Sequence, residues 1–129
     1  MRTGKFFRFT IKGDNLDPVA LKEAAGLPCG VFIKGETIEA GILKREVVQK
    51  INRWVYHTEA QDETKVEAFL TKNLEVIVSK IQILKEFANQ NEAILELIVY
   101  ADNHTDLLLS RKHIKLLSEI DIDLDISFC

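Results

Sequence analysis

Cysteine is scarce in this sequence, with two in 129 residues. Cys29 and Cys129 lie far apart, and neither has a second cysteine or a histidine at the spacing of a zinc-binding motif. The remaining residues show no other metal-ligand spacing. We therefore expect no metal site and no cofactor, and we expect both thiols to reside in a reducing cytoplasm.

Long apolar runs are also missing. No stretch approaches the roughly 20 apolar residues that a membrane-spanning helix needs. The phenylalanines near the N-terminus do not form the apolar core of a signal peptide, because Arg8, Thr10 and Lys12 interrupt them. The sequence therefore predicts a cytoplasmic protein with no membrane partner.

Catalytic motifs are absent as well. The chain has no Gly-x-Ser-x-Gly elbow, no phosphate-binding glycine loop and no dinucleotide-binding fingerprint. The glycines at positions 26, 30, 35 and 41 follow turn positions instead. A nucleophile made of Cys29 and a histidine is the weakest of the alternatives. We assign no catalytic residue from the sequence.

Charge is present but nearly balanced, at a formal net value of −3. This value is too small to predict a nucleic-acid partner. Residues 1–58 carry 10 Lys and Arg against 6 Asp and Glu, whereas residues 59–129 carry 7 against 14. The two halves can neutralise each other within one domain, or the acidic half can offer a surface to a basic protein partner.

Apolar residues follow two periods along the chain. Alternation with a period of two predicts strands over residues 5–12, 51–58 and 121–128, and short apolar runs predict further strands over residues 31–33, 93–100 and 106–109. A short helix is predicted between Asp17, as N-cap, and Gly26, just past its end. Further helices are predicted over residues 62–88 and 111–120, and residues 37–46 are predicted to be a loop or an irregular edge.

The helix predicted over residues 62–88 is too long for a small domain. At 1.5 Å per residue its 27 residues would span about 40 Å, against roughly 30 Å for the domain. We therefore predict a break near Ser79–Gln82. The apolar stripe of this helix would cover a sheet whose last strand turns Ile122, Leu124, Ile126 and Phe128 inward.

These elements predict a single α+β domain over residues 1–129. Its architecture is a single-layer antiparallel or mixed sheet of about five strands with helices packed on one face. The segment from Ala93 to Cys129, in the order strand, turn, strand, helix, strand, holds most of the strand signal. We expect the rest of the chain to pack on it.

Several short segments recur in the order seen in a known family. They are Phe9 to Pro18, Gly26 to Pro28, Lys34 to Glu36, Trp54 to Thr58, Leu109-Ser110 and Asp121 to Ile126. With these segments the chain resembles domain of unknown function 4279, an uncharacterised and mainly bacterial family. The resemblance implies a compact α+β single domain, and it carries over no catalytic residue.

Two groups of residues are candidates for binding. Trp54 and Tyr56 share one face of their predicted strand, and exposed aromatic residues of these types often anchor a protein partner. The alternative is burial of the only tryptophan against the long helix. Asp121, Asp123 and Asp125 share one face of the last strand, where they could meet a basic protein. Their alternative is a solvated face paired across the sheet with a basic strand, for which Arg8 and Lys12 are suitable.

The three histidines share no metal-ligand spacing. His104 lies in a predicted turn beside Asp102 and Asp106, and His113 is predicted on the exposed side of its helix. His57 or His104 could act as a general acid or base if a carboxylate lies within hydrogen-bond reach in a cleft between sheet and helix.

Three functions remain open. The first is a non-enzymatic protein-binding module, such as an immunity protein that neutralises a toxin through an acidic surface. The second is a small enzyme that uses a histidine and a carboxylate. The third is a self-associating structural domain in which the edge strand Val31–Ile33 pairs with its copy, so that monomer and homodimer are both allowed.

Overall fold

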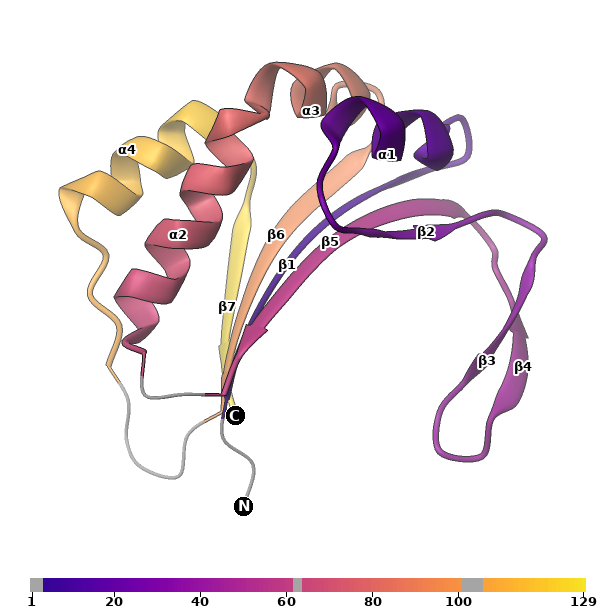
Figure 1. The fold of residues 1–129 in the computed structure, drawn as a ribbon, viewed down its shortest axis with the longest axis horizontal. Helices are drawn as coiled ribbons and strands as arrows, with labels where there is room; N and C mark the ends of the chain where they lie inside the picture. Colours follow the sequence, from indigo (N-terminus) through magenta and orange to yellow (C-terminus); the bar gives the residue numbers. More distant parts are fainter. Residues whose placement is uncertain (1–3, 62–63, 101–105) are drawn as a thin grey trace.

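The computed structural model describes residues 4–61, 64–100 and 106–129 (Figure 1). Its main sheet has five strands in the order β2-β5-β1-β6-β7. β1 lies at the centre and runs antiparallel to both β5 and β6, whereas β7 runs parallel to β6. The predicted mixed sheet of about five strands is confirmed. The strands are β1 Gly4–Gly13, β2 Gly30–Phe32, β5 Asn52–Ala60, β6 Glu92–Tyr100 and β7 Leu124–Phe128.

All helices of the described residues lie on one side of this sheet (Figure 1). They are α1 Pro18–Ala25, α2 Val66–Ser79, α3 Ile81–Ala88 and α4 Arg111–Ile120. α1 begins where the Ala20 N–H donates to Asp17 Oδ1 over 3.1 Å, and it ends at Gly26, whose φ is 65°. Both ends agree with the helix start at Asp17 and the helix end at Gly26 that the sequence predicts.

The long middle helix is broken at Lys80, as predicted. α2 ends at Ser79 and α3 begins at Ile81, while Lys80 has φ −118° and ψ 16°. The Lys80 N–H donates to Ile77 O over 3.1 Å, which tightens the last turn of α2. The chain turns at this point, so that α2 and α3 follow the curved sheet beneath them (Figure 1).

The hydrophobic core lies between the sheet and these helices. Alternate side chains of β1, β5 and β6 point toward the helices, and they pack against an apolar stripe on α2 and α3. The fully buried side chains include Phe7, Phe9, Ile11, Trp54, Leu70, Leu74, Ile77, Leu84, Leu95 and Leu97. Ile122, Leu124 and Ile126 pack against this core, as predicted, although Phe128 at the end of β7 is about half exposed.

Two predictions for the C-terminal part are wrong. Residues 106–109 form no strand, and Leu108 is largely exposed. The last strand begins at Leu124 and not at Asp121, because Asp121 ends α4 in the left-handed region (φ 55°), where its N–H donates to Leu117 O. The helix then returns the chain so that β7 joins β6 in parallel, which a tight turn could not do.

Residues 37–46, predicted to be irregular, fall largely within a regular hairpin. β3 Thr37–Ala40 pairs antiparallel with β4 Arg45–Val48, and the hairpin projects from the main sheet (Figure 1). Its turn uses Gly41 (φ 81°) and Lys44 (φ 49°), and the Lys44 N–H donates to Gly41 O. Because the hairpin stands away from the core, four of its apolar side chains are exposed and they show no readable alternation. They are Ile42, Leu43, Val47 and Val48.

Candidate functional site

The face of the sheet opposite the helices is hollowed. The hollow is an open groove of about 860 Å³, lined by residues of β2, β5, β1 and β6. At about 4.8 Å between neighbouring strands, these four strands span roughly 14 Å. We call this surface the open face. It consists of the side chains that alternate with the buried ones, so every residue on it is placed by the same strand that builds the core.

Charged side chains cross the open face in two rows. In the first row Lys12 of β1 lies between Arg53 of β5 and Glu92 of β6. Lys12 Nζ lies 3.5 Å from Glu92 Oε2. Both side chains of this pair are substantially exposed, so solvent screens their attraction.

The second row lies four residues along the strands, about 13 Å away. Here Arg8 lies between His57 of β5 and Glu96 of β6, and Asp125 of β7 follows Glu96. Arg8 Nη1 is 3.8 Å from Glu96 Oε1. The His57 ring stacks on Phe6, with 5.9 Å between ring centroids and 8° between planes. The rows therefore become acidic toward β6 and β7.

A less polar row separates the two charged rows. It consists of Gly30, Val55, Thr10 and Ile94, on β2, β5, β1 and β6 respectively. Ile94 is 36% exposed, although a hydrophobic residue at the centre of a strand is usually covered. The open face thus has an apolar floor with a row of charged side chains on either side. Binding sites commonly combine apolar and charged groups in this way.

Arg53 is the most firmly held cation of the open face. Its guanidinium carbon lies 4.6 Å from the centre of the Phe32 ring, and its Nη2 donates to Gln49 Oε1 over 3.1 Å. Gln49 is itself buried and is anchored through its backbone, since its N–H donates to Glu36 O and its carbonyl accepts from the Gly35 N–H. The guanidinium therefore has a defined position.

Trp54 and Tyr56 do not form the exposed patch considered from the sequence. They lie on the helix-covered face, with 0% and 4% of their surfaces exposed, so the alternative of burial holds. The Tyr56 hydroxyl donates to Asn73 Oδ1 over 3.1 Å, and the Thr58 hydroxyl donates to the same oxygen over 2.6 Å. Asn73 Nδ2 donates to Phe69 O. Burial raises the pKa of the Tyr56 phenol.

The three aspartates of the C-terminal segment do not share one strand face. Asp121 ends α4, Asp123 precedes β7, and only Asp125 lies within the strand. All three are exposed, so a contact with a basic partner stays a prediction. The aspartates do not pair with the basic strand β1, because β6 lies between β7 and β1. Arg8 of β1 contacts Glu96 of β6 instead.

The histidines occupy different environments. His57 is exposed on the open face, and His104 lies outside the described residues. His113 was predicted on the exposed side of its helix, and this prediction is wrong. The side chain is buried, with 3% of its surface exposed. In the described part of the chain, no carboxylate forms a hydrogen bond or ion pair with His57.

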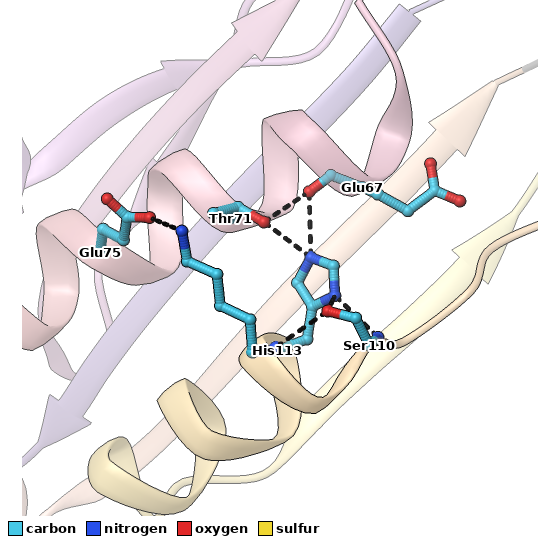
Figure 2. Close-up of polar contacts among 6 residues, drawn as sticks. Glu67, Thr71, Glu75, Ser110 and His113 are labelled. Carbon is cyan, nitrogen blue, oxygen red and sulfur yellow. Dashed lines mark hydrogen bonds and ion pairs between the residues drawn. The ribbon is translucent and has the colours of Figure 1, made fainter.

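His113 and Ser110 look like a base beside a nucleophile, but their hydrogen bonds are those of a helix cap (Figure 2). The Ser110 N–H donates to His113 Nδ1 over 3.0 Å, and the His113 N–H donates to Ser110 Oγ. Nδ1 is thus an acceptor, which leaves the ring proton on Nε2. That nitrogen lies 3.0 Å from Glu67 O and 2.8 Å from Thr71 Oγ1. The cluster ties α4 to α2.

Two further contacts support the same junction. Lys112 Nζ lies 2.9 Å from Glu75 Oε1 (Figure 2). Glu67 Oε1 accepts the Leu108 N–H over 3.2 Å. Hydrogen bonds from its own backbone N–H and from that of Leu108 lower the pKa of the Glu67 carboxyl. These contacts hold a helix in place, so the cluster is structural.

Other kinds of site find no support in the described residues. There, no three His, Cys, Asp or Glu side chains come together in a way that could hold a metal ion. No helix of residues 4–61, 64–100 and 106–129 has the length and apolar character to cross a membrane. Cys29 and Cys129 are both free thiols.

Sequence reasoning missed the residues that make the open face distinctive. Arg8 and Lys12 were considered only as partners for the aspartates, while Arg53 and Gln49 were not considered. The available signal was the alternation itself, which puts Arg8, Lys12 and Arg53 opposite the buried residues of their strands. Alternation cannot show that this face is concave, because curvature depends on the whole sheet.

Comparison with known proteins assigns the chain to a family without a known activity. The family model of the domain of unknown function DUF4279 matches residues 3–128. The chain therefore belongs to this family, as the sequence resemblance indicated. No curated protein and no solved structure matches it.

Proposed function

We propose that this member of the DUF4279 family is a non-enzymatic binding module, and that a segment of a partner protein docks on its open face. The observation that carries the proposal is the groove on the helix-free side of the sheet, which has a volume of about 860 Å³. A solvated sheet face needs neither a hollow nor an exposed apolar floor. A ligand that covers Val55 and Ile94 would remove that floor from water.

A protein segment fits this surface better than a small ligand does. The lining residues come from four strands, and the surface spans roughly 14 Å across them. Charged rows border a less polar row, which is the arrangement of a protein interface with a polar rim around an apolar centre.

The finer proposal is that the partner is a toxin and that the chain is its immunity protein. An inhibitor of this kind needs only to cover a functional surface of its partner. Asp123, Asp125 and Glu96, exposed or partly exposed beside the open face, add charge complementarity to a basic partner. The proposal includes residence in the cytoplasm, where such a toxin would act, and cell fractionation tests this.

Coexpression with the product of the adjacent gene tests the proposal. We expect the two proteins to copurify and the chain to protect cells from killing. Val55→Arg and Ile94→Arg should abolish both effects, because each places a long cation on the apolar floor. Val19→Arg is the matched control, since Val19 is an exposed valine on α1, outside the groove. Undiminished killing, or protection unchanged by the floor variants, would contradict the proposal.

A small enzyme is the second candidate, favoured by the position of His57 on the concave face. A general base would need an orienting partner, and in the described residues the contact of His57 is a stacked phenylalanine and not a carboxylate. His57→Ala separates the two candidates. It should weaken a binding module only in part, whereas it should abolish the function of an enzyme that depends on this histidine.

Self-association is the third candidate. β2 lies at the edge of the main sheet, as the proposed pairing of Val31–Ile33 requires, but it has only three residues. So short an edge provides few hydrogen bonds for a second copy. Light scattering at increasing protein concentration tests this candidate, and a monomer at high concentration would eliminate it.

A further inference from the structure

We infer that Arg53 is a carboxylate-recognition site, which takes an aspartate or glutamate side chain of the partner segment that docks on the open face. The inference rests on the proposed function and names the chemistry that the partner must present. It is carried by three observations: the guanidinium is immobilised, the neighbouring cations already have carboxylate partners, and a glycine makes room for the platform beneath it.

The guanidinium of Arg53 is held in advance of any ligand. One face lies 4.6 Å from the Phe32 ring centre, and Nη2 is occupied by Gln49 Oε1 at 3.1 Å. Arginine has five N–H donors, so these contacts leave donors available for a planar acceptor. An arginine fixed in this way loses little conformational entropy when it binds a carboxylate.

Gly30 makes this arrangement possible. A Cβ atom built on Gly30 would lie 3.2 Å from the Phe32 ring, because the ring lies beside the Gly30 backbone. A side chain at this position would require the ring to shift by a few tenths of an ångström, and the surface on which the guanidinium rests would shift with it. Gly30 does not need a left-handed backbone here, so Gly30→Ala tests the space alone.

Among the cations on the open face in the described residues, Arg53 has no carboxylate partner. Lys12 and Arg8 reach Glu92 and Glu96 on β6, whereas Arg53 has an amide as its polar partner. Arg53 also lies opposite Lys12 across the ladder, and like charges in that position repel each other. A carboxylate on Arg53 would relieve this repulsion.

A single carboxylate fits better than a polyanion. Glu92, Glu96 and Asp125 lie on the same face toward β6 and β7, where they would repel a run of phosphates. An acidic side chain directed toward β5 keeps its distance from them. The open face therefore favours a protein segment with an isolated acidic residue over a nucleic acid.

The test is an NMR titration of the full chain with N-acetyl-glutamate methylamide, whose only charge is the side-chain carboxylate. We expect the Arg53 side-chain N–H resonance to shift on titration, while the uncharged N-acetyl-glutamine methylamide leaves it unchanged. Arg53→Gln should weaken binding about tenfold or more, as expected for loss of a charge-assisted contact. Arg53→Lys should restore part of it, and Gly30→Ala should weaken it.

Arg45→Gln is the matched control, since Arg45 is an exposed arginine on the projecting hairpin. It should change the affinity by about twofold or less, because it alters net charge alone. Thermal melting of each variant checks that it folds. An equal loss in the Arg45 and Arg53 variants would overturn the inference, as would tighter binding of inorganic phosphate than of the carboxylate.

The inference and the proposed function can fail separately. If Val55→Arg abolishes copurification with the partner and Arg53→Gln does not, the open face binds the partner without this recognition site. If none of these variants affects copurification, the proposed function is wrong as well.

Discussion

The two faces of the five-stranded sheet are made by the same strands and differ in almost every physical respect. On the covered face, Phe9, Trp54 and Leu95 are fully buried beneath the helices. On the open face, their sequence neighbours include Arg8, Arg53 and Ile94, around a hollow. Because alternation assigns each residue to one face, the residues of the open face can vary without altering the core.

The two faces also treat polar groups differently. On the covered face, Asn73 is buried and both ends of its amide are hydrogen bonded, as burial requires. Among the buried side-chain polar atoms of the described residues, Trp54 Nε1 is the exception, because it has no acceptor. On the open face, the Lys12–Glu92 and Arg8–Glu96 ion pairs are 3.5 and 3.8 Å long, and their members can exchange each other for the charges of a ligand.

The largest expected effect on stability comes from truncating Trp54, which is buried on the covered face. Trp54→Ala should lower the free energy of unfolding by about 3–5 kcal/mol, because it leaves a cavity in the core. Val55→Ala, one residue along and on the opposite face, should cost less than about 1 kcal/mol. Urea unfolding measures both values. Equal losses would show that the two faces do not differ as described.

A smaller loss is expected from the buried amide. Asn73→Ala should lower the free energy of unfolding by about 1–3 kcal/mol, because it leaves the Tyr56 and Thr58 hydroxyls without their acceptor. Adding Tyr56→Phe and Thr58→Val to that variant should recover part of the loss. Lys72→Ala, an exposed neighbour on α2, is the control. No recovery in the triple variant would contradict the network.

A still smaller effect is confined to alkaline solution. Burial raises the pKa of Tyr56 above its value in the unfolded chain, so the folded phenol keeps its proton where the unfolded one loses it. Stability should therefore be unaffected below about pH 10 and fall as the pH rises from there toward the folded pKa. Urea midpoints between pH 8 and 11 measure the slope, which Tyr56→Phe should reduce.

The smallest effect is expected for the ion pairs of the open face. A double-mutant cycle on Lys12 and Glu92 should give a coupling of about 0–1 kcal/mol that shrinks as salt is added, because both side chains are solvated. A coupling above about 2 kcal/mol would mean that this face contributes to stability much as the core does.

The sequence was most informative where one signal decided the outcome. The break after Ser79 followed from helix length, and α1 followed from Asp17, Pro18 and Gly26. It was least informative where two signals competed. Asp121 fitted the alternation of a strand. Its conformation is set instead by α4, which it ends in the left-handed region.

The candidate site was predicted poorly for a related reason. Trp54 and Tyr56 were known to share a face, but alternation does not say which face the helices cover. The neighbouring Arg53 acquires its role from Phe32 and Gln49, which reach it from β2 and from beyond β4. Contacts of this kind depend on strand order, which a single sequence does not contain.

The most direct measurement is the rate of thiol labelling of Ile94→Cys, in a chain whose Cys29 and Cys129 are replaced by serine, with and without the copurified partner. Val19→Cys on α1 serves as the reference thiol. We predict fast labelling of Cys at position 94 in the free chain and protection of about tenfold or more in the complex, with the reference unchanged. Slow labelling in the free chain, or equal rates with and without partner, would contradict the claim that the open face is the binding surface.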